Sequence, residues 1–239
     1  MIRPVEGHYF STSQSAPSSP FEIRAKARGR ELCLISDRGV FSAERLDRGT
    51  RLLLDSMELA EGARVLDVGC GYGALGIFAG LDGAGEVLMV DVNPRAVGLA
   101  WLNAQRHGLA DSTLAVVADG TGALARQWAD LCLLNPPIRA GREVVASLIH
   151  GGAQCLRPRG RLALVARTSQ GVRSLARVMA DVLDEVGTVA KGGGFRVVEG
   201  TARVSEGPED RRGNPCANER PDAGPHMGER PFGTPGIGR

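Results

Sequence analysis

Short apolar runs alternate with longer amphipathic segments through the middle of the 239-residue chain. The clearest helical pattern runs from Pro94 to His107, because Asn93 suits an N-cap, Pro94 suits the first turn and Gly108 follows the end. A further helix is expected over about residues 171–183. Strands are predicted at residues 64–68, 86–91, 113–118, 131–134, 161–167, 186–190 and 195–202.

This order of elements predicts an α/β fold, in which helices cover both faces of a mostly parallel sheet. The last two predicted strands are separated only by Lys191-Gly192-Gly193-Gly194. A connection this short permits a hairpin but not a right-handed crossover. We therefore expect the final strand to run antiparallel to its neighbour.

Two regions lie outside the alternation. Residues 1–60 are predicted to form an N-terminal extension, with a strand-like pattern at 21–35 and a short amphipathic helix at 50–59. Residues 61–205 are expected to form the core. Residues 206–239 are expected to be a disordered tail, because glycine, proline and charged residues dominate and large apolar groups are scarce.

Basic residues recur with a period of two in the N-terminal extension. Arg24, Lys26 and Arg28 would share one face of a strand, and Arg30 extends the row. The formal net charge is only +2, but nearly all basic residues are arginine, which suits phosphate and also reflects nucleotide bias in some genomes. We hypothesise that this face contacts RNA phosphates, an ordinary solvated face being the alternative.

The remaining composition excludes some classes of protein. The five cysteines form no C-x-x-C pair, so we expect reduced thiols and no metal site. No run approaches the ~18 apolar residues of a membrane span, and the first residues lack the apolar segment of a signal peptide. A cytoplasmic protein without a membrane partner is expected, and its oligomeric state is left open.

A glycine-dense turn follows the first predicted strand of the core. Gly69, Gly71 and Gly73 leave no side chain between the backbone and a ligand, and the helix that begins near Ala74 offers free N–H groups to an anionic group. A nucleotide-like ligand is implied. The same glycines also fit a dinucleotide fingerprint, so a nicotinamide or flavin enzyme stays possible on this motif alone.

Three aspartates follow successive strands or lie at their ends. Asp91 is placed to accept from both hydroxyls of a ribose, and Asp119 to accept from an adenine amine. Asp67, inside the first strand, suits a cationic ligand such as S-adenosylmethionine, whereas a pyrophosphate would be repelled. Each aspartate has a structural alternative as a helix cap, a turn or an acceptor for the glycine loop.

The sequence Asn135-Pro136-Pro137-Ile138 follows another apolar strand. A base amine becomes nucleophilic when its hydrogens are held so that the nitrogen can pyramidalise. The side-chain carbonyl of Asn135 and the backbone carbonyl of Pro136 can accept those hydrogens, while the prolines fix the backbone. Amine methylation needs such a turn and hydride transfer does not, so the turn favours a methyltransferase. Ile138 could give apolar contact to the base.

With these motifs in this order, the chain resembles the class I S-adenosylmethionine-dependent methyltransferases. The segments G39-V-F-S42, L46-D-R-G49, L52-L-L-D-S56 and N135-P-P-I-R-A-G-R142 resemble, more narrowly, the methyltransferase small-domain family. That family includes ribosomal RNA small-subunit guanine-N2 methyltransferases. The resemblance implies a Rossmann-like fold with seven strands in the order 3-2-1-4-5-7-6. It also implies that Asp67, Gly69 and Gly71 contact the methionine part of the cofactor.

The resulting hypothesis is methyl transfer from S-adenosylmethionine to an exocyclic base amine in RNA, with guanine N2 of small-subunit ribosomal RNA as acceptor. The partner would be that RNA or an assembling small subunit. Other enzymatic interpretations are an adenine-N6 or a protein-glutamine methyltransferase and, more remotely, a nicotinamide oxidoreductase. A non-catalytic RNA-binding assembly factor is the alternative from a different class.

Overall fold

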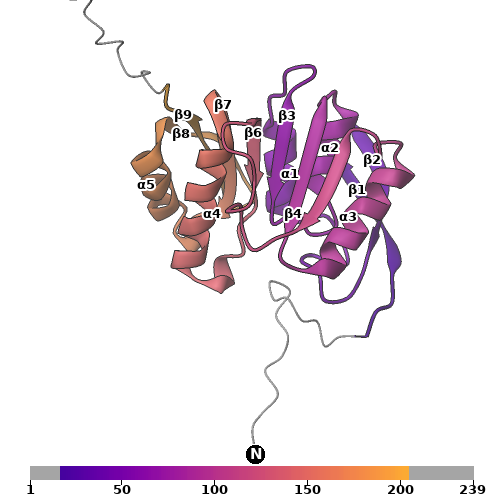
Figure 1. Cartoon of the computed structure of the whole chain (residues 1–239). Coiled ribbons are helices and arrows are strands. Elements are labelled where there is room, and N and C mark those ends of the chain that lie inside the picture. Colours follow the sequence, from indigo (N-terminus) through magenta and orange to yellow (C-terminus); the bar gives the residue numbers. More distant parts are fainter. Residues whose placement is uncertain (1–16, 205–239) are drawn as a thin grey trace, which may run out of the picture. The chain divides into compact units, whose positions relative to one another are not determined.

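The computed structural model describes residues 17–204 (Figure 1). Residues 1–16 and the predicted tail at 206–239 lie outside the described residues. The strands are β1 (Phe21–Ala27), β2 (Arg30–Ser36), β3 (Arg64–Val68), β4 (Glu86–Asp91), β5 (Thr113–Val117), β6 (Ala129–Leu134), β7 (Leu156–Arg167), β8 (Leu183–Gly192) and β9 (Phe195–Ala202). The helices are α1 (Arg48–Ser56), α2 (Ala74–Leu81), α3 (Pro94–Arg106), α4 (Arg142–Cys155) and α5 (Val172–Val182), with short 3-10 helices η1 (Ile138–Ala140) and η2 (Thr168–Gln170).

Seven strands form one sheet in the order β5-β4-β3-β6-β7-β9-β8. Strands β3 to β7 are parallel, and β9 runs antiparallel to both β7 and β8. Counted from β3, this is the order 3-2-1-4-5-7-6. The predicted Rossmann-like fold and the antiparallel last strand are therefore confirmed.

Successive side chains of the strands pack into two different hydrophobic cores, one on each face of the sheet. Val65, Met89 and Leu133 belong to the core under α1, α2 and α3, whereas Leu66 and Leu134 belong to the core under α4 and α5. This division follows from the two-residue period of a strand, which sends successive side chains to opposite faces. Because both faces are buried, the strands read as continuous apolar runs.

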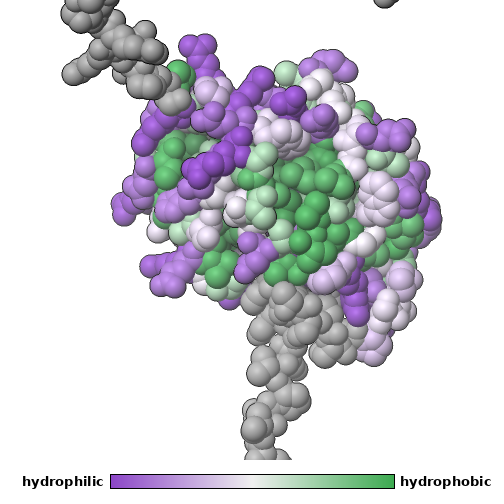
Figure 2. Space-filling view, viewed as in Figure 1, coloured by the Kyte–Doolittle hydropathy of each residue, from purple (hydrophilic) through white to green (hydrophobic). Residues whose placement is uncertain are grey.

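Within residues 17–204, part of one face of the sheet has no helix over it. The segment 118–128, between β5 and β6, contains no α-helix. It leaves an apolar groove of about 370 Å³ lined by Leu66, Leu88, Leu114 and Trp128, among others, and Leu114 on the edge strand is 58% exposed. Figure 2 shows hydrophobic side chains gathered over the middle of this face, where Figure 1 shows β3 and β4 without a helix in front.

The prediction of one strand over residues 21–35 is wrong. The chain reverses at Arg28 and Gly29, which have φ angles of 51° and 72°, so that Ala27 pairs with Arg30 in an antiparallel hairpin. A two-residue turn with positive φ at both positions matches the twist of the flanking strands. The hairpin of β1 and β2 is a separate two-stranded sheet that shares the core of α1, α2 and α3.

The hairpin turn also changes the interpretation of its basic residues. The guanidinium of Arg28 donates to the Asp82 carboxylate and to the carbonyls of Leu54 and Met57, both at 2.7 Å. Arg30 forms an ion pair with the same aspartate at 3.0 Å. Arg28 is therefore a structural anchor rather than part of an RNA-binding row, which corrects its predicted role.

In residues 17–204, no helix combines the length and the apolar character that crossing a bilayer requires. Four free cysteines lie in this range, three of them buried and Cys33 exposed.

Candidate active site

The predicted site motifs meet at the carboxyl edge of the parallel strands. A cavity of about 260 Å³ opens there, between the loops that follow β3, β4, β5 and β6. Ligands bind at this edge in open α/β sheets, where the strand order reverses. Of the predicted site residues, those lining the cavity are Gly69, Gly71, Asp91, Asp119, Asn135, Pro136 and Pro137.

The three glycines of the loop have two different roles. All three have positive φ, at 71°, 56° and 89° for Gly69, Gly71 and Gly73. A Cβ at Gly69 or Gly71 would meet nothing within 4 Å, whereas a Cβ at Gly73 would come within 3.0 Å of Ala100 and Met89. The first two glycines thus expose backbone to the cavity, but Gly73 permits close packing of α3 and β4. Gly73 does not line the cavity as predicted for a cofactor contact.

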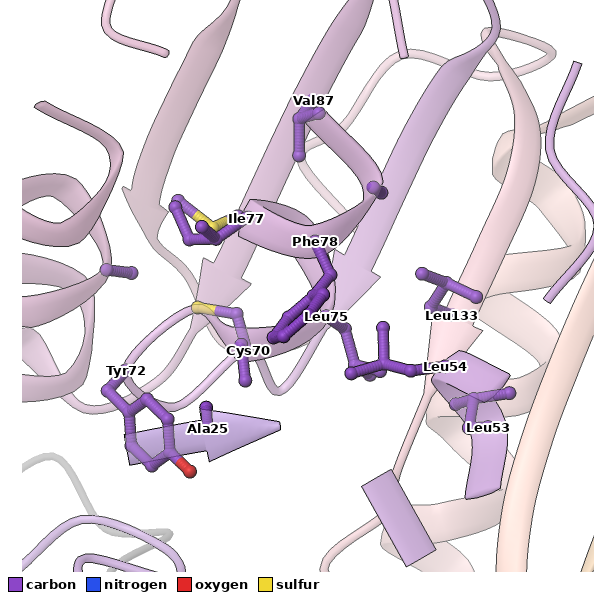
Figure 3. Packing of buried hydrophobic residues seen from close by; sticks show 14 of the residues in the cluster. Ala25, Leu53, Leu54, Cys70, Tyr72, Leu75, Ile77, Phe78, Val87 and Leu133 are labelled. Atoms are coloured by element: carbon purple, nitrogen blue, oxygen red, sulfur yellow. The ribbon is translucent and has the colours of Figure 1, made fainter. Parts of the chain in front are cut away.

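The side chains between these glycines anchor the loop. Figure 3 shows Cys70 and Tyr72 among the buried apolar residues, with Tyr72 toward the strand that carries Ala25. The carbonyl of Tyr72 accepts from Asn103 Nδ2 at 2.9 Å, and Asn103 also bonds both backbone groups of Ile35 in β2. This fully buried asparagine therefore ties the glycine loop to the hairpin. Nothing in the sequence pattern indicated it.

Asp91 holds the shape of the loop and also lines the cavity. Its Oδ2 accepts from Gly71 N at 2.9 Å, and its Oδ1 accepts from Asn93 N at 2.9 Å. Burial raises the pKa of the Asp91 carboxyl, while the bonds from backbone N–H groups act in the opposite direction. Each carboxylate oxygen has further lone pairs, so two hydroxyls could still be accepted. Asp119 is exposed at the same cavity.

Asp67 lies behind the loop rather than on the cavity wall. Its side chain is fully buried, Oδ2 accepts from Gly76 N at 3.0 Å, and Oδ1 has no hydrogen-bond partner among the described residues. Burial raises the pKa of Asp67 to about 7, and the nearby Asp91 charge acts in the same direction. The described contacts show Asp67 as an acceptor for the first turn of α2, and no hydrogen bond from the glycine loop itself reaches it within residues 17–204. The orphan oxygen still leaves room for a cationic neighbour.

The Asn135-Pro136-Pro137 turn is sharply folded. Ile138 N donates to the carbonyl of Pro136 at 2.9 Å, and Pro137 has φ −74° and ψ 79°. These values describe an inverse γ-turn centred on Pro137, whose ring fixes φ near this value. The Pro136 carbonyl keeps one lone pair for another donor.

Asn135 lines the cavity, and neighbouring side chains hold its amide. Its Nδ2 donates to Thr50 Oγ1 at 2.8 Å and contacts Asp47 Oδ2 at 3.4 Å. Within the described residues no group donates to its Oδ1. Asn135 also lines a smaller neighbouring hollow with Phe41, Gly69 and Gly71. The amide thus presents its oxygen as the free acceptor where the two hollows meet.

Besides Gly73 and Asp67, two further features of the site differ from the sequence prediction. Ile138 packs against the core under α4 and α5 and does not line the cavity, so its predicted contact with a base is not supported. Phe41, from the loop before α1, instead gives an aromatic wall to both hollows. The segment G39-V-F-S42 carried the family resemblance but no geometric signal for this placement.

Comparisons with known proteins agree with this geometry. The family described as methyltransferase small domain matches residues 31–199. The uncharacterized protein YbxB of Bacillus subtilis is 34% identical over 194 residues, which cover 80% of this chain and 96% of that protein. Ribosomal RNA small subunit methyltransferase C of Pseudomonas aeruginosa is 34% identical over 172 residues, which cover 70% of this chain and 50% of that protein.

A solved structure is similar as well. The 16S rRNA N2 G1207 methyltransferase of T. thermophilus, in complex with AdoMet and guanosine, aligns with a TM-score of 0.70 and 26% identity. The alignment covers 80% of this chain and 53% of that one, so this chain spans about half the length of this protein and of the P. aeruginosa relative. With the fold and the order of the motifs, these findings confirm the resemblance: the chain belongs to the methyltransferase small-domain family and is an S-adenosylmethionine-dependent methyltransferase.

Proposed function

We propose that the protein methylates an exocyclic base amine in ribosomal RNA, with guanine N2 of the small-subunit RNA as the acceptor. The orientation of Asn135 carries this proposal, because its amide oxygen faces the cavity while its NH₂ group is held by Thr50 and Asp47. A base amine offers two N–H donors, and an acceptor is the complementary partner. The names of the P. aeruginosa and T. thermophilus proteins supply the RNA and guanine parts of the proposal.

The residues that line the cavity suit S-adenosylmethionine. Gly69 and Gly71 present bare backbone, Asp91 would hold the ribose hydroxyls and Asp119 the adenine amine. When Asp67 is ionised, its orphan Oδ1 would add negative potential behind the loop, and a ligand with a sulfonium and an ammonium would favour that ionised form. The bound cofactor supplies an electrophilic methyl group.

The residues of the turn would activate the acceptor by position rather than by proton removal. Asn135 Oδ1 and the Pro136 carbonyl would accept hydrogen bonds from the two amine hydrogens. Held in this way, the nitrogen can pyramidalise, so that its lone pair is less conjugated with the ring and more nucleophilic. The amine becomes acidic once it carries the methyl group, and its proton can then leave to water. A strong general base is therefore not required.

Three exposed arginines beside the cavity support a nucleic-acid substrate. Arg48 is next to Asp47 at the start of α1, Arg139 lies in η1, and Arg142 begins α4. None of these side chains forms an ion pair or hydrogen bond within residues 17–204. Arginine in the first turn of a helix opposes the helix dipole, so Arg48 and Arg142 reduce helix stability slightly. We propose that they bind phosphates on either side of the target base.

The proposed partner is small-subunit ribosomal RNA or an assembling small subunit, and the proposed compartment is the cytoplasm. Incubation with labelled S-adenosylmethionine and naked RNA, small subunits, DNA or whole-cell protein tests the acceptor class. We expect label in small-subunit RNA and N2-methylguanine in its digest. Label in N6-methyladenine or in protein glutamine would replace the proposed acceptor, and binding of cofactor without any transfer would favour a non-catalytic assembly factor.

A further inference from the structure

We infer that Thr50 and Asp47, at the start of α1, are positioning residues that set the direction of the Asn135 amide. The inference rests on the proposed function, in which the Asn135 oxygen accepts from the target amine. It extends that function to a helix far away in sequence, since Thr50 and Asn135 are separated by 85 residues.

The contact geometry allows only one orientation of the amide. Asp47 Oδ2 already accepts from Gly49 N at 2.8 Å and from Thr50 N at 3.1 Å, as the N-cap of α1. An ionised carboxylate has no proton to donate. A flip of the Asn135 amide would bring its oxygen against this carboxylate and turn its NH₂ group toward the cavity. Two donors would then face the amine, which itself offers donors, and the acceptor would be lost.

Thr50 makes the shorter of the two contacts, at 2.8 Å, and its side chain is buried with the residue only 7% exposed. Because Asn135 Nδ2 is a donor, the Thr50 hydroxyl must accept there. Gly49 allows the close approach of these groups, since a Cβ at that position would come within 2.9 Å of both Asp47 Oδ2 and the Phe195 ring. The arrangement is thus fixed by packing as well as by hydrogen bonds.

The test compares Thr50→Val, which keeps the shape and removes the acceptor, with Thr50→Ser, which restores it. We expect Thr50→Val to lose about ten- to thirtyfold in kcat, less than removal of Asn135 because Asp47 remains. Its KM for the acceptor and its Kd for S-adenosylmethionine should stay within about twofold of the parent values. Thr50→Ser should recover most of kcat.

Thr113→Val is the matched control. Thr113 is also 7% exposed, its Oγ1 has no hydrogen-bond partner within residues 17–204, and it begins β5 away from the cavity. Its kcat should equal that of the parent. A similar loss of kcat in both valine variants would mean that the effect is general loss of packing, and it would overturn the inference.

A double-mutant cycle separates positioning from a general structural role. Thr50→Val should cost nothing further in an Asn135→Ala background, because its only effect acts through the amide. Additive losses would overturn the inference. Unchanged kcat in Thr50→Val with a large loss in Asn135→Ala would overturn the inference about Thr50 and leave the proposed function intact. Unchanged kcat in both variants would also remove Asn135 from the proposed function.

If Thr50→Val does not fold, Asp47→Ser provides a second route. Serine keeps an N-cap acceptor for α1 but is too short to reach the Asn135 amide. A loss of kcat at unchanged cofactor affinity is expected again, and full activity would contradict the inference.

Discussion

The parallel strands of the central sheet begin at an amino edge and end at a carboxyl edge, and the carboxylates at these two edges have different partners. At the amino edge, Glu86 forms an ion pair with Arg64 at 3.3 Å, and Asp130 accepts from Arg64 N at 2.8 Å and forms an ion pair with Arg157. At the carboxyl edge, Asp67 and Asp91 bond only to backbone N–H groups within the described residues. The same parallel strands contribute to both edges. The fold alone therefore does not explain why the carboxylates have cationic partners at one edge and only backbone N–H partners at the other.

We infer that the carboxylates at the carboxyl edge lower the stability of the free protein and favour ligand binding. The carboxylates at the amino edge have cationic partners in the protein itself, and the exposed Arg64–Glu86 pair is worth about 0 to 1 kcal/mol. Burial without a neighbouring cation makes the ionised forms of Asp67 and Asp91 costly to the free protein, and we propose that a bound cofactor offsets part of this cost. Variants test this contrast. At the carboxyl edge they should change turnover, ligand binding and the pH dependence of stability, and at the amino edge they should change only stability, and only slightly.

The largest effect is expected for Asn135. Asn135→Ala should lose on the order of 10² to 10³ in kcat, as when a preorganised hydrogen-bonding partner of a transition state is removed. Calorimetry should show nearly unchanged affinity for S-adenosylmethionine. Asn135→Asp should recover little, because its carboxylate would lie beside Asp47. Full turnover in the alanine variant would exclude the turn from the mechanism.

Asp91 should matter for cofactor affinity. Asp91→Ala is expected to weaken S-adenosylmethionine binding by about 1.5 to 3 kcal/mol, the range for hydrogen bonds to a charged group. The variant also removes the bond from Gly71 N, so a thermal melt should accompany the calorimetry. NAD should not bind the parent protein. Binding of NAD without S-adenosylmethionine binding would contradict the assignment of the cofactor site.

Asp67 should make the free protein less stable as the pH rises. Its folded pKa of about 7 lies above its unfolded value, so from pH 5 to pH 7 the unfolded state is ionised while the folded state holds the proton. Stability therefore falls with pH in this window. Relative to the parent, Asp67→Asn should gain on the order of 2 kcal/mol between pH 5 and pH 8. Urea denaturation at both pH values measures this, and a constant difference would show that Asp67 is ionised throughout.

The arginines beside the cavity should carry part of the salt dependence of RNA binding. Replacing Arg48, Arg139 and Arg142 with Gln should lower the slope of log K against log salt by roughly 0.7 for each phosphate that is no longer neutralised. The matched control replaces Arg64, Arg106 and Arg203, which are paired with acidic side chains elsewhere, and should leave the slope unchanged. An unchanged slope in the first variant would show that these three arginines do not contact RNA phosphates.

The same assay tests what is left of the hairpin hypothesis. Arg24 is exposed and forms an ion pair with Glu31 at 3.6 Å, and Lys26 is exposed on the same strand. Arg24→Ser with Lys26→Ser should change the slope less than the cavity variant, because Glu31 already offsets one of the two charges. A larger change would restore the hairpin as an RNA contact.

The smallest effect belongs to the amino edge. Arg64→Gln removes an ion pair whose two side chains are each about half exposed, so the free energy of unfolding should change by less than about 0.5 kcal/mol. Thermal melting at low and high salt measures this. A loss of several kcal/mol would show that the amino edge depends on its charges.

The sequence predicted the central sheet well because its signals are local. Apolar runs, the caps of α3 at Asn93 and Pro94, and the glycines after β3 each depend on neighbours within a few residues. The positions of Asp91 and Asn135 followed from their places after successive parallel strands, because such strands end at the same edge.

The remaining features depend on distant contacts. The turn at Arg28 and Gly29 had a local signal in the glycine, but Arg28 tolerates φ 51° with its guanidinium fixed by Asp82 and by two carbonyls near the end of α1. Asn103 and Thr50 gave no periodic signal, because each acts through a side-chain bond to a residue far along the chain. Gly73 was assigned to the ligand because the motif does not distinguish packing glycines from exposed ones.

The missing helix between β5 and β6 should be visible in hydrogen exchange. Among the described residues, strand β5 is an edge strand of the sheet, bonds to β4 alone and is covered by α3 on a single face. Amides in such a strand open by local fluctuation long before the whole protein unfolds. Asp119, the proposed acceptor for the adenine amine, lies two residues beyond this edge strand and lines the cavity. Slower exchange in residues 113–120 would therefore be a sensitive local report of an occupied cofactor site, even where the rest of the sheet exchanges too slowly to respond.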